Sequence, residues 1–135
     1  MTSPERVMRL SPVIPVLTIE NAAWARPIAE ALVAGGLRAL EVTLRTPAAL
    51  EVIAEMSKVE GAVVGAGTVL NSGDLDQALA AGATFVVSPG LTNPLAEAAI
   101  AAGAPFLPGV ANAGDIMRGV ALDPQELKIK KIQRN

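Results

Sequence analysis

The sequence predicts an α/β protein built on one parallel sheet, and two regularities lead to this expectation. Short runs of β-branched and other apolar residues begin roughly every 20 to 25 residues, the length of a strand, a crossover helix and two short loops. The stretches between these runs are rich in Ala and Leu, and several of them end at a glycine. Strands that alternate with helices in this way form parallel sheets with right-handed crossovers.

Six runs are expected to be strands, which leaves room for five crossover helices and for a short helix before Pro12. The runs are residues 13–17, 37–44, 62–66, 84–87, 105–107 and 127–129. A closed (βα)8 barrel needs eight strands and typically about 250 residues, whereas this chain has 135. We therefore expect residues 1–135 to form a single domain, either a shortened barrel or an open six-stranded sheet.

Capping residues and glycines predict where the helices begin and end. The predicted starts are Thr46-Pro47 and Asn93-Pro94, each an N-cap followed by a first-turn proline, and the caps Asn71, Ser72 or Asn112. The predicted stops are Gly35-Gly36, Gly82 and Gly103. Pro27 is compatible with a helix that begins near Trp24, because a proline is tolerated in the first turn.

Composition excludes several classes of protein and of site. Hydrophobic residues make up 51% of the chain and charged residues 18%, so most of it is expected to fold. The absence of Cys and His excludes disulfides, thiol nucleophiles, Ser-His-Asp triads and any metal held by imidazole. The net charge of -2 leaves no general footprint for nucleic acid, although the segment from Lys128 onward is basic.

Targeting signals are also missing from the sequence. The N-terminal residues before Pro12 include too few apolar side chains for a signal peptide, and no apolar run reaches the roughly 18 residues of a membrane helix. We therefore expect a cytoplasmic protein that binds neither nucleic acid nor a membrane.

The second run separates its side chains by parity. Leu40, Val42 and Leu44 form an apolar face suited to packing under helices, and the opposite face carries Ala39, Glu41, Thr43 and Arg45. In a barrel the opposite face is the interior, where a carboxylate is costly to bury unless it is paired. Arg45 can pair with Glu41 or neutralise a ligand carboxylate near the strand ends. The structural alternatives are an ion pair that only closes the barrel end, and an edge strand that shows both side chains to water.

The last run places Leu127 and Ile129 on one face and Lys128 and Lys130 on the other. If the apolar pair faces the helices, Lys128 points into the barrel. A lysine in a partly dry interior near another cation supplies the neutral amine that attacks a ketone carbon, which a Schiff-base enzyme requires. The alternative is a solvated basic terminus.

Two glycine-containing turns complete the candidate site, Gly65-Ala66-Gly67-Thr68 and Ser88-Pro89-Gly90-Leu91-Thr92. Their glycines let the backbone approach a ligand, and the Thr68 and Ser88 hydroxyls can donate to a carboxylate. Tight βα turns explain the same glycines equally well. The first turn lacks the third glycine of a dinucleotide-binding fingerprint, so a nucleotide cofactor is not expected.

Five blocks occur in order: Val13-Ile14-Pro15-Val16, Ala31-Leu32-Val33-Ala34-Gly35-Gly36, Glu41-Val42-Thr43-Leu44-Arg45-Thr46, Gly65-Ala66-Gly67-Thr68-Val69-Leu70 and Ser88-Pro89-Gly90-Leu91-Thr92. Together they cover roughly residues 11–119, and with them the chain resembles the 2-keto-3-deoxy-6-phosphogluconate (KDPG) and 4-hydroxy-2-oxoglutarate (KHG) aldolases. The resemblance implies a TIM-type (βα)8 barrel, here an incomplete parallel barrel of about six strands. It also implies a homotrimeric class I aldolase without metal or cofactor, a lyase of carbohydrate metabolism that cleaves a 2-keto-4-hydroxy acid to pyruvate and an aldehyde.

The resemblance also assigns roles to individual residues. Glu41 matches the proton-shuttling glutamate, Arg45 and Thr68 match groups that hold the pyruvate carboxylate, and Pro89 matches a proline that lines the site. An ungapped continuation places the imine-forming lysine on Lys128. The tail, residues 123–135, departs from the family pattern, because Ile129, Lys130, Lys131 and Ile132 replace the aromatics, proline and alanine expected there.

Two alternatives to the enzyme stay open at this point. One is a non-catalytic, truncated aldolase-like fragment or assembly subunit whose half barrel is completed by another chain. The other is a small-molecule binding module that keeps only the carboxylate site. In the family, strands seven and eight bring the phosphate cradle, and they lie beyond the part of the pattern that this sequence carries.

Overall fold

A computed structural model describes residues 3–122 and the backbone of residues 130–131. Within this part of the chain six strands form one sheet in the order β1-β2-β3-β4-β5-β6, and every neighbouring pair is parallel. The strands are β1 (Val16–Leu17), β2 (Ala39–Thr43), β3 (Val63–Gly67), β4 (Phe85–Ser88), β5 (Phe106–Val110) and β6 (Lys130–Lys131). A doubly wound sheet reverses its strand order at a switch point, whereas a (βα)8 barrel keeps chain order, so the topology is that of an incomplete barrel.

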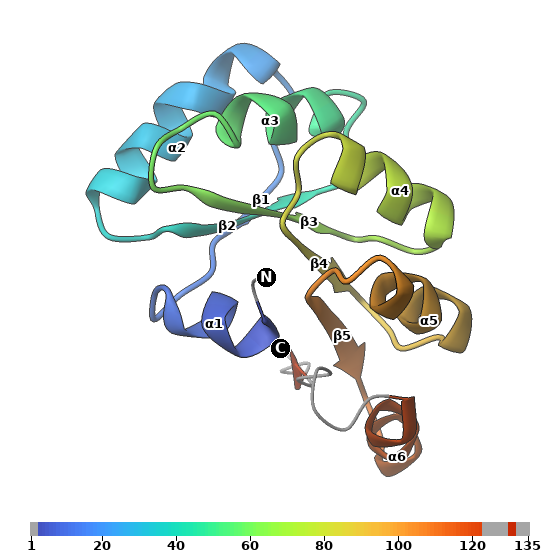
Figure 1. Ribbon diagram of the computed structural model, residues 1–135. Helices are drawn as coiled ribbons and strands as arrows, with labels where there is room; N and C mark the ends of the chain where they lie inside the picture. The colour runs from blue at the N-terminus through green and yellow to red at the C-terminus, as the bar shows by residue number, and fades with distance from the viewer. Residues whose placement is uncertain (1–2, 123–129, 132–135) are drawn as a thin grey trace.

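The helices lie on two sides of this curved sheet (Figure 1). After each of the strands β1 to β5 the chain forms a helix on the outer, convex side, namely η1 (Ala22–Trp24) with α2 (Ala25–Ala34), α3 (Ala49–Met56), α4 (Ser72–Ala80), α5 (Asn93–Ala101) and α6 (Ala113–Leu122). The short helix α1 (Pro4–Arg9), expected before Pro12, lies on the concave side. No helix in the described ranges is both long and apolar enough to cross a membrane.

The core is divided by the sheet, as the alternation in the second run predicts. Leu40 and Val42 belong to the large cluster between the sheet and the outer helices. Ala39 belongs to a smaller cluster on the inner face, together with Val7 of α1, Phe85, Val87 and Leu107. Because α1 closes this inner cluster at the N-terminal ends of the strands, the opposite, C-terminal end of the inner face is the part available for a site.

Several predicted helix boundaries are confirmed. Asn71 caps α4, since its Oδ1 accepts from the Asp74 amide at 2.9 Å, and Asn112 does the same for Asp115 before α6. The helix that contains Pro27 begins at Ala25, so the proline lies in its first turn. The predicted glycine stops have the left-handed backbone that ends a helix, with φ values of 89° at Gly36, 107° at Gly82 and 63° at Gly103.

Two predicted caps are wrong. Thr46 does not cap α3, because this helix begins at Ala49 and the Thr46 hydroxyl donates to the Ile19 carbonyl oxygen at 2.8 Å. The cap position of α5 is Thr92 rather than Asn93, although Pro94 lies in the first turn as expected. The strand predicted at residues 127–129 lies outside the described residues, and the sixth strand is described only at Lys130–Lys131.

Candidate functional site

Glu41 is the buried carboxylate at the centre of the candidate site. It lies two residues after Ala39 in β2, so the strand alternation places it on the inner face. Its residue is only 5% exposed, and Thr43, two residues further on, is 1% exposed. A carboxylate is rarely buried this deeply unless its charge is used or compensated, so Glu41 marks the inner face as a candidate for chemistry.

The glycines of β3 leave space for side chains of the neighbouring strands. In the register of the sheet Gly65 pairs with Glu41 and Gly67 pairs with Thr43. A Cβ atom at Gly65 would collide with the Phe85 ring, and one at Gly67 would lie 2.9 Å from the Glu41 carboxyl carbon. The sequence interpretation of these glycines, close approach of a ligand or a tight turn, missed this role as neighbours of large side chains.

Thr68 follows β3 directly and has an unusual backbone conformation. Its φ of 58° lies in the left-handed region, which β-branched residues rarely adopt. Hydrogen bonds on both sides hold the conformation, from the Leu44 amide to the Gly67 oxygen at 2.9 Å and from the Val69 amide to the Val87 oxygen at 3.2 Å. Strained residues of this kind cluster at functional sites, which supports the choice of Thr68 as a site residue.

Hydroxyl groups join β1 to the end of β2 beside Glu41. The Thr43 hydroxyl donates to the Leu17 carbonyl oxygen at 3.1 Å and lies 2.9 Å from the Thr18 hydroxyl. Since a hydroxyl has a single proton, Thr18 donates in the second contact whenever Thr43 donates to Leu17. The alternation of β2 predicts Thr43 on the inner face, but the sequence indicates no role for Thr43 or Thr18, because their contacts join residues about 25 positions apart.

The loop between β4 and α5 carries Ser88 and the candidate residue Pro89. Ser88 is 5% exposed and its hydroxyl accepts from the Gly90 amide at 3.5 Å, so it faces its own turn. Pro89 is exposed. The predicted role of the Ser88 hydroxyl as a donor to a ligand is not tested by this contact.

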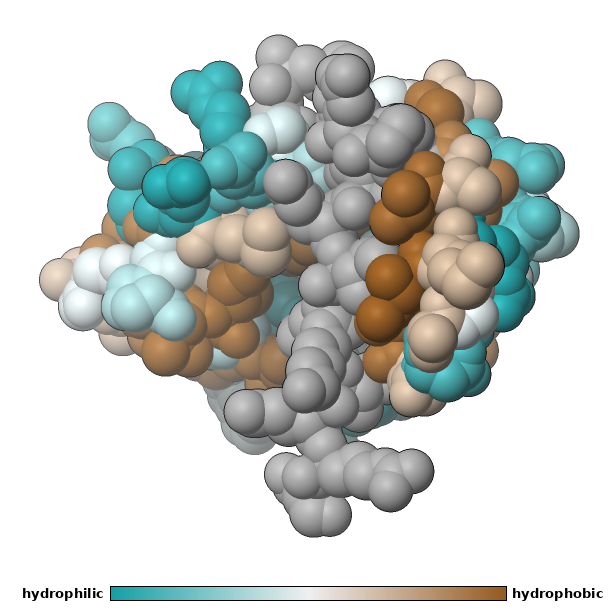
Figure 2. All heavy atoms as spheres, turned by 90° about the horizontal axis from the view of Figure 1, so that it is seen from below, coloured by the Kyte–Doolittle hydropathy of each residue, from teal (hydrophilic) through white to brown (hydrophobic). Residues whose placement is uncertain are grey.

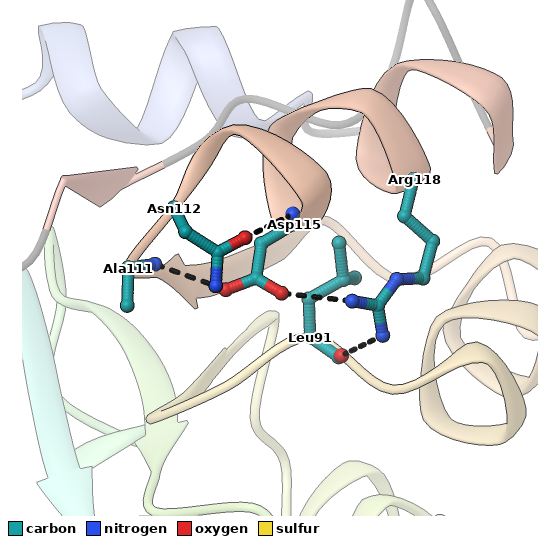
Figure 3. Close-up of polar contacts among 5 residues, drawn as sticks. All are labelled: Leu91, Ala111, Asn112, Asp115 and Arg118. Carbon is teal, nitrogen blue, oxygen red and sulfur yellow. Dashed lines mark hydrogen bonds and ion pairs between the residues drawn. The ribbon is translucent and has the colours of Figure 1, made fainter.

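Arg118 of α6 connects this loop to the loop between β5 and α6 (Figure 3). Its guanidinium donates to the Leu91 carbonyl oxygen at 3.4 Å and to Asp115 Oδ1 at 2.8 Å. Asp115 Oδ2 accepts from the Ala111 amide at 3.1 Å, and Asn112 Oδ1 accepts from the Asp115 amide at 2.9 Å. The start of α6 therefore supports the loop that carries Pro89.

The predicted site residues lie in or directly after consecutive strands. Glu41 lies in β2, Arg45 follows β2 and is exposed, Thr68 follows β3, and Pro89 follows β4. Because the strands are parallel, their carboxyl ends lie at one edge of the sheet, where TIM-barrel sites are built. Lys128 lies outside the described residues, while Lys130 of β6 pairs with Gly109 of β5. Among the residues that the structure describes, no three acidic side chains group as candidate metal ligands.

The fold and the buried carboxylate define the class of this protein, and its relatives define the family. A parallel sheet in barrel order with a buried carboxylate on its inner face defines a protein built on a partial TIM barrel. A family model described as "KDPG and KHG aldolase" matches residues 5–131. The chain belongs to the KDPG and KHG aldolase family.

The relatives are longer than this chain. The 2-dehydro-3-deoxy-phosphogluconate aldolase of Zymomonas mobilis is 62% identical over 128 residues, which cover 95% of this chain and 62% of the relative. The KHG/KDPG aldolase of Escherichia coli K12 is 44% identical over 135 residues, which cover 63% of that protein. The chain thus spans about three fifths of the length of these curated relatives.

Solved structures show the same fold. The KDPG aldolase of Zymomonas mobilis ATCC 29191 superposes with a TM-score of 0.88 and 63% identity, over 90% of this chain and 59% of that one. The KDPG aldolase of Legionella pneumophila, solved with pyruvate captured as a covalent carbinolamine, has a TM-score of 0.86 and 42% identity over 90% of this chain and 60% of that one. These comparisons confirm the predicted fold class.

Proposed function

We propose that this chain carries the chemistry of a class I aldolase, a lyase that cleaves 2-keto-3-deoxy-6-phosphogluconate or 4-hydroxy-2-oxoglutarate to pyruvate and an aldehyde. The observation that carries the proposal is Glu41, a carboxylate 5% exposed on the inner face of a partial barrel. Its position suits a general acid and base at the C-terminal ends of the strands. The covalent pyruvate adduct in the Legionella relative supports imine chemistry in this family.

Lys128 is the proposed nucleophile. Its neutral amine attacks C2 of the keto acid to give a carbinolamine, and loss of water gives a protonated imine. Glu41 delivers the proton to the departing water and later removes the proton of the C4 hydroxyl. The C3–C4 bond then breaks, its electron pair moves to C3 and the imine, and the aldehyde leaves. Glu41 returns this proton to C3 of the resulting enamine, and hydrolysis of the imine releases pyruvate and restores Lys128.

The remaining proposed residues hold the substrate. The Arg45 guanidinium is suited to a two-point hydrogen bond with the keto-acid carboxylate, and the Thr68 hydroxyl can donate to the same group. Pro89 would line the site from the next loop. No cofactor or metal takes part in the proposed sequence, because the protonated imine is the electron sink. We further propose that the protein acts in the cytoplasm.

Reductive trapping tests the proposal. The chain is incubated with pyruvate and borohydride, and intact-mass and peptide mass spectrometry locate the reduced adduct. We expect one pyruvyl adduct on Lys128, its loss in Lys128→Arg and its retention in the matched control Lys130→Arg. Absence of an adduct under conditions that label the full-length Zymomonas relative would overturn the proposal, and an adduct on Lys130 or Lys131 would overturn the assignment to Lys128.

A non-catalytic assembly subunit is the second candidate, and the open edges of the sheet favour it. In the described part of the chain β1 and β6 are the end strands, and such edges offer unpaired backbone groups to another chain. Figure 2 shows apolar side chains gathered on the face that carries α1 and α6. The exposed apolar residues of α6 are Ile116, Met117 and Val120, which we name the α6 apolar face.

Light scattering on a sizing column tests the assembly candidate. The family resemblance leads us to propose a homotrimer, so we expect three times the chain mass. A stable monomer that also traps no pyruvate would overturn both proposals, the enzyme and the assembly subunit. A monomer that traps pyruvate would retain the enzyme and overturn the trimer.

A further inference from the structure

Gly67 occupies the place where a side chain would meet the Glu41 carboxylate. We propose that Gly67 is a positioning residue, whose missing side chain leaves the space that sets where the Glu41 carboxylate lies. This inference rests on the aldolase chemistry proposed above, in which Glu41 moves protons. It differs from the two roles that the sequence suggested for Gly67, close approach to a ligand and a tight turn.

The contact is direct. A Cβ atom built at Gly67 would lie 2.9 Å from both Cγ and Cδ of Glu41 and closer still to Oε1. Real Cβ atoms essentially never approach another heavy atom within 3.0 Å, so a side chain at this position and the observed position of the carboxylate exclude each other.

The backbone of Gly67 does not itself require glycine. The described glycines with positive φ are Gly36, Gly61, Gly82 and Gly103, and Gly67 is not among them. An alanine would therefore be free of backbone strain at position 67. The structural reason for glycine at this position is the neighbouring carboxylate, whereas at Gly65 it is the Phe85 ring of the core.

Backbone hydrogen bonds hold the end of β3 in place. The Gly67 oxygen accepts from the Leu44 amide at 2.9 Å, and two residues later the Val69 amide donates to the Val87 oxygen at 3.2 Å. These bonds hold β3 to the strands on both sides, while the end of the Glu41 side chain can rotate about its own bonds. An added methyl group is therefore expected to displace the carboxylate rather than the sheet.

Displacement of the Glu41 carboxylate is expected to slow proton transfer without unfolding the chain. A general acid or base must lie within hydrogen-bond reach of its proton, and a misplacement of about 1 Å can cost roughly 100-fold in rate. Glu41 speeds the loss of water that forms the imine but does not set the equilibrium between keto acid and imine. Gly67→Ala should thus slow proton transfer and leave the equilibrium amount of imine unchanged, whereas a general loss of structure would lower both.

The experiment measures both steps in the same variants. The equilibrium amount of imine is measured by borohydride trapping after prolonged incubation with pyruvate, and proton transfer is followed by NMR as deuterium exchange at C3 of pyruvate. For Gly67→Ala we expect a final amount of adduct within a few fold of wild type and exchange slower by about 100-fold. The matched control is Gly35→Ala on the outer surface, where a Cβ has only ordinary contacts at 3.5 Å, and both quantities should be unchanged. Exchange at the wild-type rate in Gly67→Ala would overturn the proposal.

Second-site variants test the contact itself. Glu41→Asp shortens the side chain by one methylene, so Gly67→Ala should lower the melting temperature less in the Glu41→Asp background than in wild type. Removing the carboxylate with Glu41→Ala should abolish the cost of Gly67→Ala almost entirely. An equal cost in all backgrounds would overturn the positioning role. This measurement needs no activity, so a wild-type chain that traps no pyruvate would reject the proposed function and leave the positioning of Glu41 to be decided by the melting temperatures.

Discussion

Thr68 joins backbone strain to a proposed binding role in one residue. Its φ of 58° is unfavourable for a β-branched side chain, since the left-handed region costs roughly 1–2 kcal/mol for L-residues other than glycine. The neighbouring Gly67 has no such strain but gives space to Glu41. At this turn the threonine has the backbone conformation that favours glycine, and the preceding glycine has a φ that other residues can also adopt. Strain of this kind is typical of a functional site rather than of a connecting loop.

Thr68→Gly should raise stability and weaken substrate binding at the same time. Glycine relieves the left-handed strain, and a gain of about 1 kcal/mol raises the melting temperature by a few degrees. Loss of the hydroxyl should raise the pyruvate concentration needed for half-maximal trapping. Differential scanning calorimetry and the trapping titration measure the two effects, with Thr68→Ser as the control that keeps the hydroxyl. A lower melting temperature for Thr68→Gly would contradict the strain argument.

Glu41→Gln keeps the shape of the buried side chain but removes its base. General acid and base groups typically contribute about 10²–10⁴-fold, so deuterium exchange into pyruvate should fall by that factor. The variant should remain folded, as near-ultraviolet circular dichroism can verify. Unchanged exchange would show that another group moves the proton.

At the scale of elements, two βα loops use the same cap. In the loop before α4, Asn71 accepts from the Asp74 amide and Asp74 accepts from the Leu70 amide at 3.0 Å. Asn112 and Asp115 repeat this arrangement before α6. The second loop differs by Arg118, which adds the connection to Leu91 in the neighbouring loop.

Replacing the two aspartates separates their bonds within each loop from the connection between loops. Asp74→Ala and Asp115→Ala keep the backbone amides that bond to the asparagine caps and lose the carboxylates that accept from the Leu70 and Ala111 amides. Each should cost about 1 kcal/mol of stability, as a lost hydrogen bond does. Asp115→Ala also releases the Arg118 guanidinium, so amides of residues 88–92 should exchange with deuterium faster in this variant. In Asp74→Ala these amides should exchange as in wild type. Equal protection of residues 88–92 in both variants would show that Arg118 does not support the loop.

At the scale of the whole molecule, the open sheet edges and exposed apolar side chains lie on the side that a complete barrel would close. The strands β1 and β6 are the sheet edges in the described part of the chain, and Val16 of β1 is 53% exposed. The α6 apolar face adds Met117, which is 72% exposed. Exposed apolar surface and open edges together favour association.

Met117→Lys should weaken self-association without unfolding the chain. A charge on the α6 apolar face is costly to bury in an interface but is solvated in the monomer. Light scattering over a dilution series should show a smaller mass than wild type, and the melting curve at low concentration should be unchanged. Ala31→Lys, an equal charge change at an exposed position of α2, is the matched control. An unchanged mass for Met117→Lys would place the contact elsewhere.

Local patterns in the sequence predict the elements and their faces because they depend on residues only a few positions apart. The alternation of Leu40 and Val42 with Glu41 and Thr43 fixes which face of β2 is polar. The cap at Asn71 needs only its own loop. The prediction for Thr46 is wrong because its hydroxyl bonds to Ile19, which the sheet brings near and the sequence pattern does not show.

The sequence by itself determined a parallel α/β chain, the inner-face position of Glu41 and, through its resemblance, the aldolase family. The tertiary structure decided the barrel order of the strands, the left-handed backbone of Thr68 and the contact between Gly67 and the Glu41 carboxylate. The physical reason is the distance along the chain over which each interaction acts. Side-chain alternation and capping act within one strand or one turn, whereas strand order and contacts across strands depend on the register between segments that are far apart in the chain.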